Sequence, residues 1–214
     1  MEIIDEYSSD STVSYLSDSS FLFEQEDFYL IQKPYELNPK ISSITSTLNL
    51  GCNLNLKIIS QKIKTAEYNN DSKFSLTLKL KDNNSIAALY PNGKMICTGA
   101  KSEKEAKSNC IKFSKMIKKA GFYTNLKEFK ITNISGNYDI NFNLNLNKLY
   151  KEMNHLYESC KYDKNAFPGI TLYINDINFT FFENGKIMFS GAKKKKDIEY
   201  IFNAIYPLLI EAKT

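Results

Sequence analysis

Cysteine and histidine are the side chains of this sequence that could bind a metal or serve as nucleophile and base. The 214 residues contain a single histidine, His155, and four cysteines that form no C-x-x-C pair: Cys52, Cys97, Cys110 and Cys160. Structural zinc sites need closely spaced ligands, and disulfide frameworks need denser cysteines. The sequence also contains no phosphate-binding glycine loop and no Ser-His-Asp arrangement. We therefore expect a reduced, intracellular protein that is not an enzyme and binds no metal or cofactor.

Lysine is the residue type whose abundance does suggest a chemistry. All 28 basic residues are lysine, and the net charge is +4. Residues 1–40 hold nine acids and two lysines, a charge of −7, so residues 41–214 carry +11. A basic body of this size suits an anionic partner, with nucleic acid the first candidate. On charge alone, a solvated lysine-rich surface explains the composition equally well.

A repeated phrase brings lysines and aromatic residues together. The sequence reads GKMICTGAK at 93–101 and GKIMFSGAK at 185–193, ninety-two positions apart. An Asn-Gly pair opens each phrase, in LYPNGKM and FFENGKI, and predicts a three-residue β-hairpin loop. In that register Tyr90 faces Lys94. The chain thus contains a duplicated unit of roughly ninety residues.

Alternation along the two hairpins separates a core face from a second face. In the second hairpin, four apolar residues fall on one side, which we expect to be core: Phe179, Phe181, Ile187 and Phe189. The opposite side carries Thr180, Phe182, Lys186, Met188 and Ser190. The first hairpin places on the corresponding side Ala88, Tyr90, Lys94, Ile96 and Thr98. A face turned only to solvent would not normally carry an aromatic residue twice, so we expect this face to contact a partner.

The elements around the hairpins repeat as well. Ser102 and Glu105 have the spacing of a capping box and predict a helix over 102–119, which Gly121 ends. Hydrophobic periodicity predicts a second long helix over 194–212. The other expected elements are strands at 41–50, 72–80, 128–136 and 169–174 and helices at 56–66 and 144–157. We predict an α+β fold of two similar halves, related by a pseudo-twofold axis, whose antiparallel sheets join.

The first forty residues differ from the rest in composition. They are rich in serine and acids and show no steady hydrophobic period, so we expect a disordered arm. We expect three regions: the arm at 1–40, a first repeat at 41–130 and a second repeat at 131–214. The arm could occupy the basic body in competition with an anionic ligand, or serve only as a solvated tail. No apolar run is long enough to span a membrane, and no signal peptide is expected.

The duplicated segments resemble the TATA-binding protein family of general transcription factors. The resemblance covers about 41–214 and is carried by TLNLGCNLNLK (47–57), AEYN (66–69), GKMICTGAKSE (93–103), FPGI (167–170), GKIMFSGAK (185–193) and IYP (205–207). It implies a saddle whose curved sheet forms the concave side and whose helices form the convex side. It also implies a nuclear protein that binds the minor groove of A/T-rich DNA, kinks the duplex and nucleates the preinitiation complex.

The resemblance assigns side chains to the DNA. Two aromatic pairs that enter base steps match Phe74 with Tyr90 and Phe167 with Phe182, the second pair stiffened by Pro168. Asparagines that read base edges match Asn133 and, as a departure from the family, Ser43. Hydroxyl and apolar groove contacts match Thr98, Ser190, Ile96 and Met188. Phosphate contacts match Lys73, Lys79, Lys94, Lys101, Lys186 and Lys193.

The resemblance also implies protein partners on the helix side. Lys112 and Lys119 match the surface that meets transcription factor IIA, and Asp163 matches an acidic contact to factor IIB. The family has a second acidic residue in that contact, and this sequence has Asn165 at its position. TATA-binding-protein-associated factors are further expected partners, and no membrane contact is expected.

Departures at the groove surface leave a second interpretation open. Thr45 and Ser135 stand where the family commonly has valine, so together with Ser43 and Tyr90 they make this surface more polar. These residues favour a related factor with altered or reduced TATA specificity that acts mainly as a protein scaffold. The DNA-binding factor remains the first expectation.

Overall fold

The computed structural model describes residues 37–68 and 75–214 and consists of two similar sets of elements. The first set is β1 (Lys40–Asn49), α1 (Leu56–Lys62), β2 (Ala66–Tyr68), β3 (Leu76–Lys79), β4 (Ile86–Leu89), β5 (Lys94–Ala100) and α2 (Glu103–Lys119). The second set is β6 (Lys127–Asp139), α3 (Leu146–Leu156), β7 (Cys160–Lys161), β8 (Gly169–Ile174), β9 (Ile177–Phe182), β10 (Lys186–Ala192) and α4 (Lys195–Glu211).

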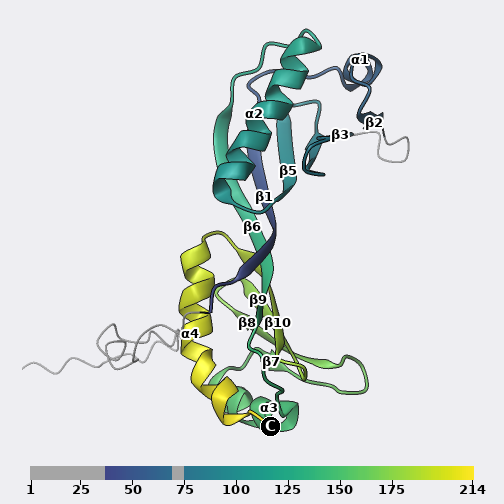
Figure 1. Cartoon of the computed structure of the whole chain (residues 1–214). Coiled ribbons are helices and arrows are strands. Elements are labelled where there is room, and N and C mark those ends of the chain that lie inside the picture. The colour runs from purple at the N-terminus through teal and green to yellow at the C-terminus, as the bar shows by residue number, and fades with distance from the viewer. Residues whose placement is uncertain (1–36, 69–74) are drawn as a thin grey trace, which may run out of the picture. The chain divides into compact units, whose positions relative to one another are not determined.

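All ten strands belong to one antiparallel sheet (Figure 1). Their order is β2-β3-β4-β5-β1-β6-β10-β9-β8-β7, so the first set occupies one half of the sheet and the second set the other. The halves meet where β1 pairs with β6, and the order outward from that pair is the same on both sides. This arrangement confirms the predicted α+β fold with its duplicated, joined sheets.

The two long hairpins form as the turn residues predict. The backbone N–H of Tyr90 donates to the carbonyl oxygen of Lys94 at 3.0 Å, and Gly93 has a φ of +82°. A Cβ at Gly93 would also collide with the carbonyl oxygen of Cys52, so this position requires glycine for two reasons. Gly185 ends the second loop with a φ of +77°. Both loops therefore contain three residues, as expected.

Capping decides where the helices begin and end. The Ser102 hydroxyl accepts the Glu105 backbone N–H at 3.1 Å, which confirms the predicted start of α2. The Glu105 carboxylate accepts the Lys101 N–H and a bond from Asn83, which ties α2 to the β3–β4 turn. Helix α1 is shorter than predicted because the backbone at Ile63 is extended. The chain there leads directly into β2.

The helices cover one face of the sheet, and the core lies between them. The first half packs Leu89 and Met95 against Phe113 and Ile117 of α2. The second half packs Phe179 and Phe181 of β9 and Phe189 of β10 against α4, which contributes Phe202. The hairpin residues predicted to be core are all buried. Within 37–68 and 75–214, no helix combines the length and the apolar character needed to cross a membrane.

Several expectations fall on residues outside the described ranges. These are Phe74, Lys73 and nearly all of the N-terminal arm. The expected boundary between the repeats, at 130/131, falls inside β6, which continues through it from Lys127 to Asp139.

Candidate nucleic-acid interface

The face of the sheet opposite the helices carries partly exposed side chains in matching rows. Directly paired residues in antiparallel strands share a face, so the pairings define each row. One row is Thr77, Ala88, Ile96, Thr47 and Lys130. The other is Thr171, Thr180, Met188 and Asn137. We call the surface made by these rows and the residues that alternate with them on the same side the open face.

Thr47 and Asn137 belong to this face but are missing from the residues that the sequence singles out. They lie ninety positions apart and pair with Ile96 and Met188, the two apolar residues expected to contact the groove. Alternation from Thr45 and Ser135, combined with the repeat offset, was a signal that could have found them.

Phe167 and Phe182 form an aromatic pair at the outer part of the open face. Their ring centroids are 6.0 Å apart and the planes are inclined by 61°, an edge-to-face contact. Phe182 ends β9, whereas Phe167 precedes β8 and is 45% exposed. Gly169 pairs with Phe182 across these strands, and a Cβ on Gly169 would press on the Phe167 ring. The structure thus brings this predicted pair together, with Pro168 between Phe167 and the strand.

The loop before β8 is held by Asp163. Its carboxylate accepts the Asn165 N–H at 3.0 Å, and its carbonyl oxygen accepts the Phe167 N–H at 2.9 Å. Asp163 is itself exposed, so the residue expected to contact a partner protein also positions the exposed aromatic ring.

Tyr90 occupies the corresponding place in the first half. It follows β4 on the same side as Ala88 and is half-buried. Its expected partner, Phe74, lies outside the described residues. The structure therefore describes one aromatic pair completely and one member of the other.

Polar side chains gather where β1 and β6 meet at the centre of the sheet. The Asn133 side-chain oxygen accepts the Gly191 N–H at 2.6 Å, and the Ser43 hydroxyl oxygen accepts the Gly99 N–H at 3.2 Å. Both glycines have φ above +100° and lie where the sheet register shifts. Thr98 and Ser190 directly precede these glycines and are half-buried on the same side.

The lysines expected at phosphates differ in their surroundings. Lys94 and Lys186 start the second strands of the hairpins and are exposed, with their backbone N–H groups bound by Asn92 and Asn184. Lys101 is exposed at the start of α2. Two others are in ion pairs: Lys79 with Glu67 at 2.7 Å and Lys193 with Asp176 at 3.6 Å.

The helix side carries the two lysines expected to meet a partner protein. Lys112 forms an ion pair with Asp82, and its hydrogen bond holds the pKa of that carboxyl below its ordinary value. Lys119 is exposed in the last turn of α2. In the described ranges, no three His, Cys, Asp or Glu side chains come together as a metal site would require.

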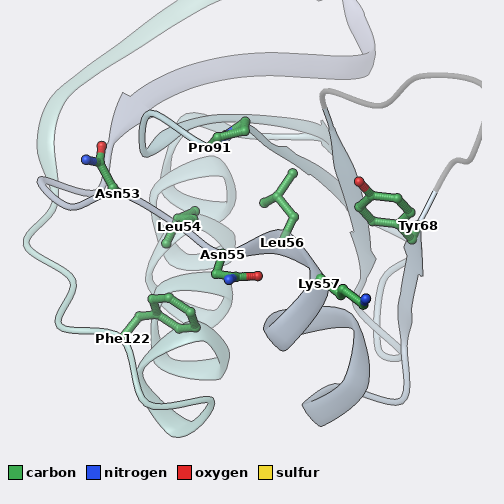
Figure 2. A pocket seen from close by; sticks show the side chains of 8 residues that line it. All are labelled: Asn53, Leu54, Asn55, Leu56, Lys57, Tyr68, Pro91 and Phe122. Carbon is green, nitrogen blue, oxygen red and sulfur yellow. The ribbon is translucent and has the colours of Figure 1, made fainter.

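A pocket of about 540 Å³ lies at the end of the first half, beside the start of α1 (Figure 2). It is lined by Asn53, Leu54, Asn55, Leu56, Lys57, Tyr68, Pro91 and Phe122. The corresponding place in the second half is covered by the end of the chain, because Leu144 forms a β-bridge with Lys213 and the Asn145 N–H bonds the Ala212 carbonyl oxygen.

Comparison with known proteins identifies relatives of both halves. The family described as transcription factor TFIID (or TATA-binding protein, TBP) matches residues 38–120 and 128–212. A TATA-box-binding protein of Acetabularia peniculus is 34% identical over 180 residues, covering 83% of this chain and 93% of that protein. TATA-box-binding protein 1 of Arabidopsis thaliana is 35% identical over 184 residues, covering 85% and 90%. The solved structure of Methanococcus jannaschii TBP has a TM-score of 0.69 at 26% identity, covering 81% of this chain and 99% of that one.

Proposed function

The chain belongs to the TATA-binding protein family, and from that membership we propose that it binds A/T-rich duplex DNA through the open face. The open face enters the minor groove, and the aromatic side chains at its ends kink the duplex. The bent DNA then nucleates assembly of the preinitiation complex in the nucleus. Transcription factors IIA and IIB and the TATA-binding-protein-associated factors are the proposed protein partners.

The edge-to-face pair of Phe167 and Phe182 is the observation that supports this proposal best. The two rings touch on the face of the sheet opposite the helices, and Phe167 is 45% exposed, so together they form an apolar patch of the kind that marks an interaction site. Inserting such a ring between bases unstacks one step at a cost of a few kcal/mol, which the bent duplex offsets through additional contact area. A flat, polar face would have no such wedge.

The base contacts assigned by this proposal lie at the centre of the open face. Asn133, Ser43, Thr98 and Ser190 supply hydrogen bonds, and Ile96 and Met188 pack on the groove floor. Met188 is 49% exposed, which fits an apolar contact that awaits a ligand. Lys94, Lys101 and Lys186, together with Lys79 and Lys193, contact phosphates as point charges.

A second candidate function is a scaffold with reduced TATA specificity. The hydroxyl groups of Ser43, Thr45 and Ser135 favour it, because they stand where the family commonly has an asparagine and two valines and distinguish bases less strictly. Electrophoretic mobility shifts with a TATA duplex and a G·C-substituted duplex of equal length separate the two functions. A DNA-binding factor retards the TATA duplex at lower protein concentration, with log affinity falling linearly against log salt. Equal affinities for the two duplexes, or an affinity that does not change with salt concentration, would exclude the DNA-binding factor.

A further inference from the structure

The two halves of the open face offer unequal hydrogen-bonding groups at equivalent places. Ser43 and Asn133 lie ninety positions apart, and each accepts the N–H of a glycine, Gly99 and Gly191, that are ninety-two positions apart. Thr45 pairs directly with Asn133 across β1 and β6, so Ser43 and Asn133 both lie beside the line where the halves meet. The same backbone feature is therefore bound by an amide in one half and by a hydroxyl in the other.

Asn133 offers a donor to a ligand, because its side-chain oxygen is turned toward Gly191. A backbone N–H must be received by an oxygen, so the 2.6 Å contact from Gly191 assigns the side-chain oxygen to that bond. The amide nitrogen carries two hydrogens and has no hydrogen-bond partner among the described residues. The side chain is half-buried on the open face, so this nitrogen is the group left for a ligand.

Ser43 belongs to a chain of hydroxyls that can donate or accept. Its oxygen lies 3.2 Å from the Thr98 hydroxyl, which lies 3.2 Å from the Thr45 hydroxyl. Each hydroxyl has one hydrogen and two lone pairs, and either direction of the chain satisfies both contacts. Two internal bonds consume two hydrogens, so one O–H remains to donate outward in either direction. Unused lone pairs also remain, so the same cluster accepts a hydrogen from a ligand.

This difference bears on how base pairs are distinguished. In the minor groove an A·T pair presents only acceptors, whereas a G·C pair adds the guanine amino group, a donor. The Asn133 nitrogen meets that amino group donor to donor, which leaves both groups unpaired. The Ser43 hydroxyl, at the place equivalent to Asn133, can accept from it. Its neighbours Thr45 and Thr98 have hydroxyl counterparts in Ser135 and Ser190, so Ser43 and Asn133 are the residues that differ in chemistry between the halves.

We propose that the A·T requirement of this protein is one-sided: strict at the base pairs that face Asn133 and relaxed at those that face the hydroxyl cluster. Ser43 is then a specificity-determining residue, and the difference from Asn133 sets the direction in which the protein lies on an uneven A/T-rich element. This inference rests on the proposed minor-groove function.

The test is a scan of a TATA duplex in which one base pair at a time is replaced by G·C, with binding measured by fluorescence anisotropy. The unmodified protein should lose affinity about fivefold or more at positions on one side of the element's centre and less than about twofold at their mirror positions. Asn133→Ser should relax the strict side. Ser43→Asn should create a second strict side, which makes the scan symmetrical.

Inosine·C provides the matched control, because it lacks the amino group but keeps the major-groove pattern of G·C. Inosine should restore affinity at the strict positions if the amino group is what Asn133 rejects. Thr45→Val removes one hydroxyl from the chain at nearly constant volume and should sharpen the discrimination against G·C on the relaxed side. This variant tests the inference even if Ser43→Asn folds poorly. A symmetrical scan for the unmodified protein, or a strict side untouched by Asn133→Ser, would overturn the inference while leaving DNA binding intact. No binding to any duplex would instead overturn the proposed function, and this inference with it.

Discussion

The ring of Phe167 meets the ring of Phe182 edge to face, with their centroids 6.0 Å apart. The contact joins the loop before β8 to the last residue of β9, and the Asp163 carbonyl oxygen fixes the backbone of the loop. Two rings held in this way keep much of their orientation before any ligand arrives. Ordering them on binding therefore costs less conformational entropy than ordering two free side chains.

Removing either ring should reduce DNA bending. Phe167→Ala and Phe182→Ala each delete a wedge, so we expect weaker binding and a smaller bend, because the kinked step loses the group that replaces base stacking. Fluorescence energy transfer across an end-labelled TATA duplex measures the bend. Tyr123→Ala is the matched control, since Tyr123 is an aromatic residue that is 81% exposed in the segment after α2. Full bending by both alanine variants would show that the pair is only structural.

Glu67 should restrain DNA binding. It pairs with Thr77 across β2 and β3, which places a carboxylate on the open face, 2.7 Å from the Lys79 ammonium. Glu67→Gln removes a charge that repels phosphate and frees Lys79, so we expect tighter binding and a salt slope steeper by about 0.9 or less. Anisotropy titrations over a series of salt concentrations give this slope.

Two lysine variants calibrate that experiment. Lys186→Ala should make the slope shallower by about 0.9, because Lys186 has no ion-pair partner in the described part of the chain. Lys115→Ala, on the exposed side of α2, should leave the slope unchanged. If Lys186→Ala makes the salt slope shallower as expected but Glu67→Gln leaves it unchanged, Lys79 contacts no phosphate.

Tyr138 should be replaceable by phenylalanine with a gain in stability. Its ring stacks on Phe202 at 3.7 Å, while its buried hydroxyl has no hydrogen-bond partner among the described residues. An unpaired buried hydroxyl typically costs ~1–3 kcal/mol, so we expect Tyr138→Phe to raise the free energy of unfolding by about 1 kcal/mol. Urea denaturation near neutral pH measures the difference. A loss of stability would reveal a partner for the hydroxyl.

The same variant should change the response to alkaline pH. Burial raises the pKa of Tyr138 above its ordinary value of 10.0. Above that pH the unfolded chain releases this proton and the folded chain keeps it, so stability falls as pH rises, by up to about 1.4 kcal/mol per unit. Phenylalanine has no such proton, so the advantage of Tyr138→Phe should grow above roughly pH 10. A constant difference would contradict this.

Cys52 should be the thiol that reacts first in the folded protein. It is partly exposed, whereas Cys97, Cys110 and Cys160 are buried. Partial burial raises the Cys52 pKa, so its labelling should be slower than that of a free thiol but faster than that of the other three. Ellman's reagent should titrate one group before unfolding and none in Cys52→Ser. Two fast groups would indicate opening of the core.

Local chemistry made the hairpins and the start of α2 predictable. Gly93 and Gly185 follow from their turns, and the Ser102 cap follows from its spacing to Glu105. The contacts of Asn133 and Glu67 were not predictable in the same way. The Asn133 bond to Gly191 depends on a register shift between Phe189 and Ala192, and the Glu67–Lys79 pair depends on which strand lies at the edge. These contacts depend on how the strands pair in the assembled sheet, and the periodicity of one strand does not predict that pairing.

The pairing of β1 with β6 has the geometry of a subunit interface enclosed in one chain. Each strand belongs to a different repeat, they run antiparallel, and the strand order is the same on both sides of them. A chain holding only one repeat would expose this edge, and two copies joining there would rebuild the sheet as a homodimer. Such a dimer would carry identical residues at the places of Ser43 and Asn133. It would therefore match only symmetrical ligands. With both repeats in one chain, the edge is covered and the residues on the two sides are free to differ.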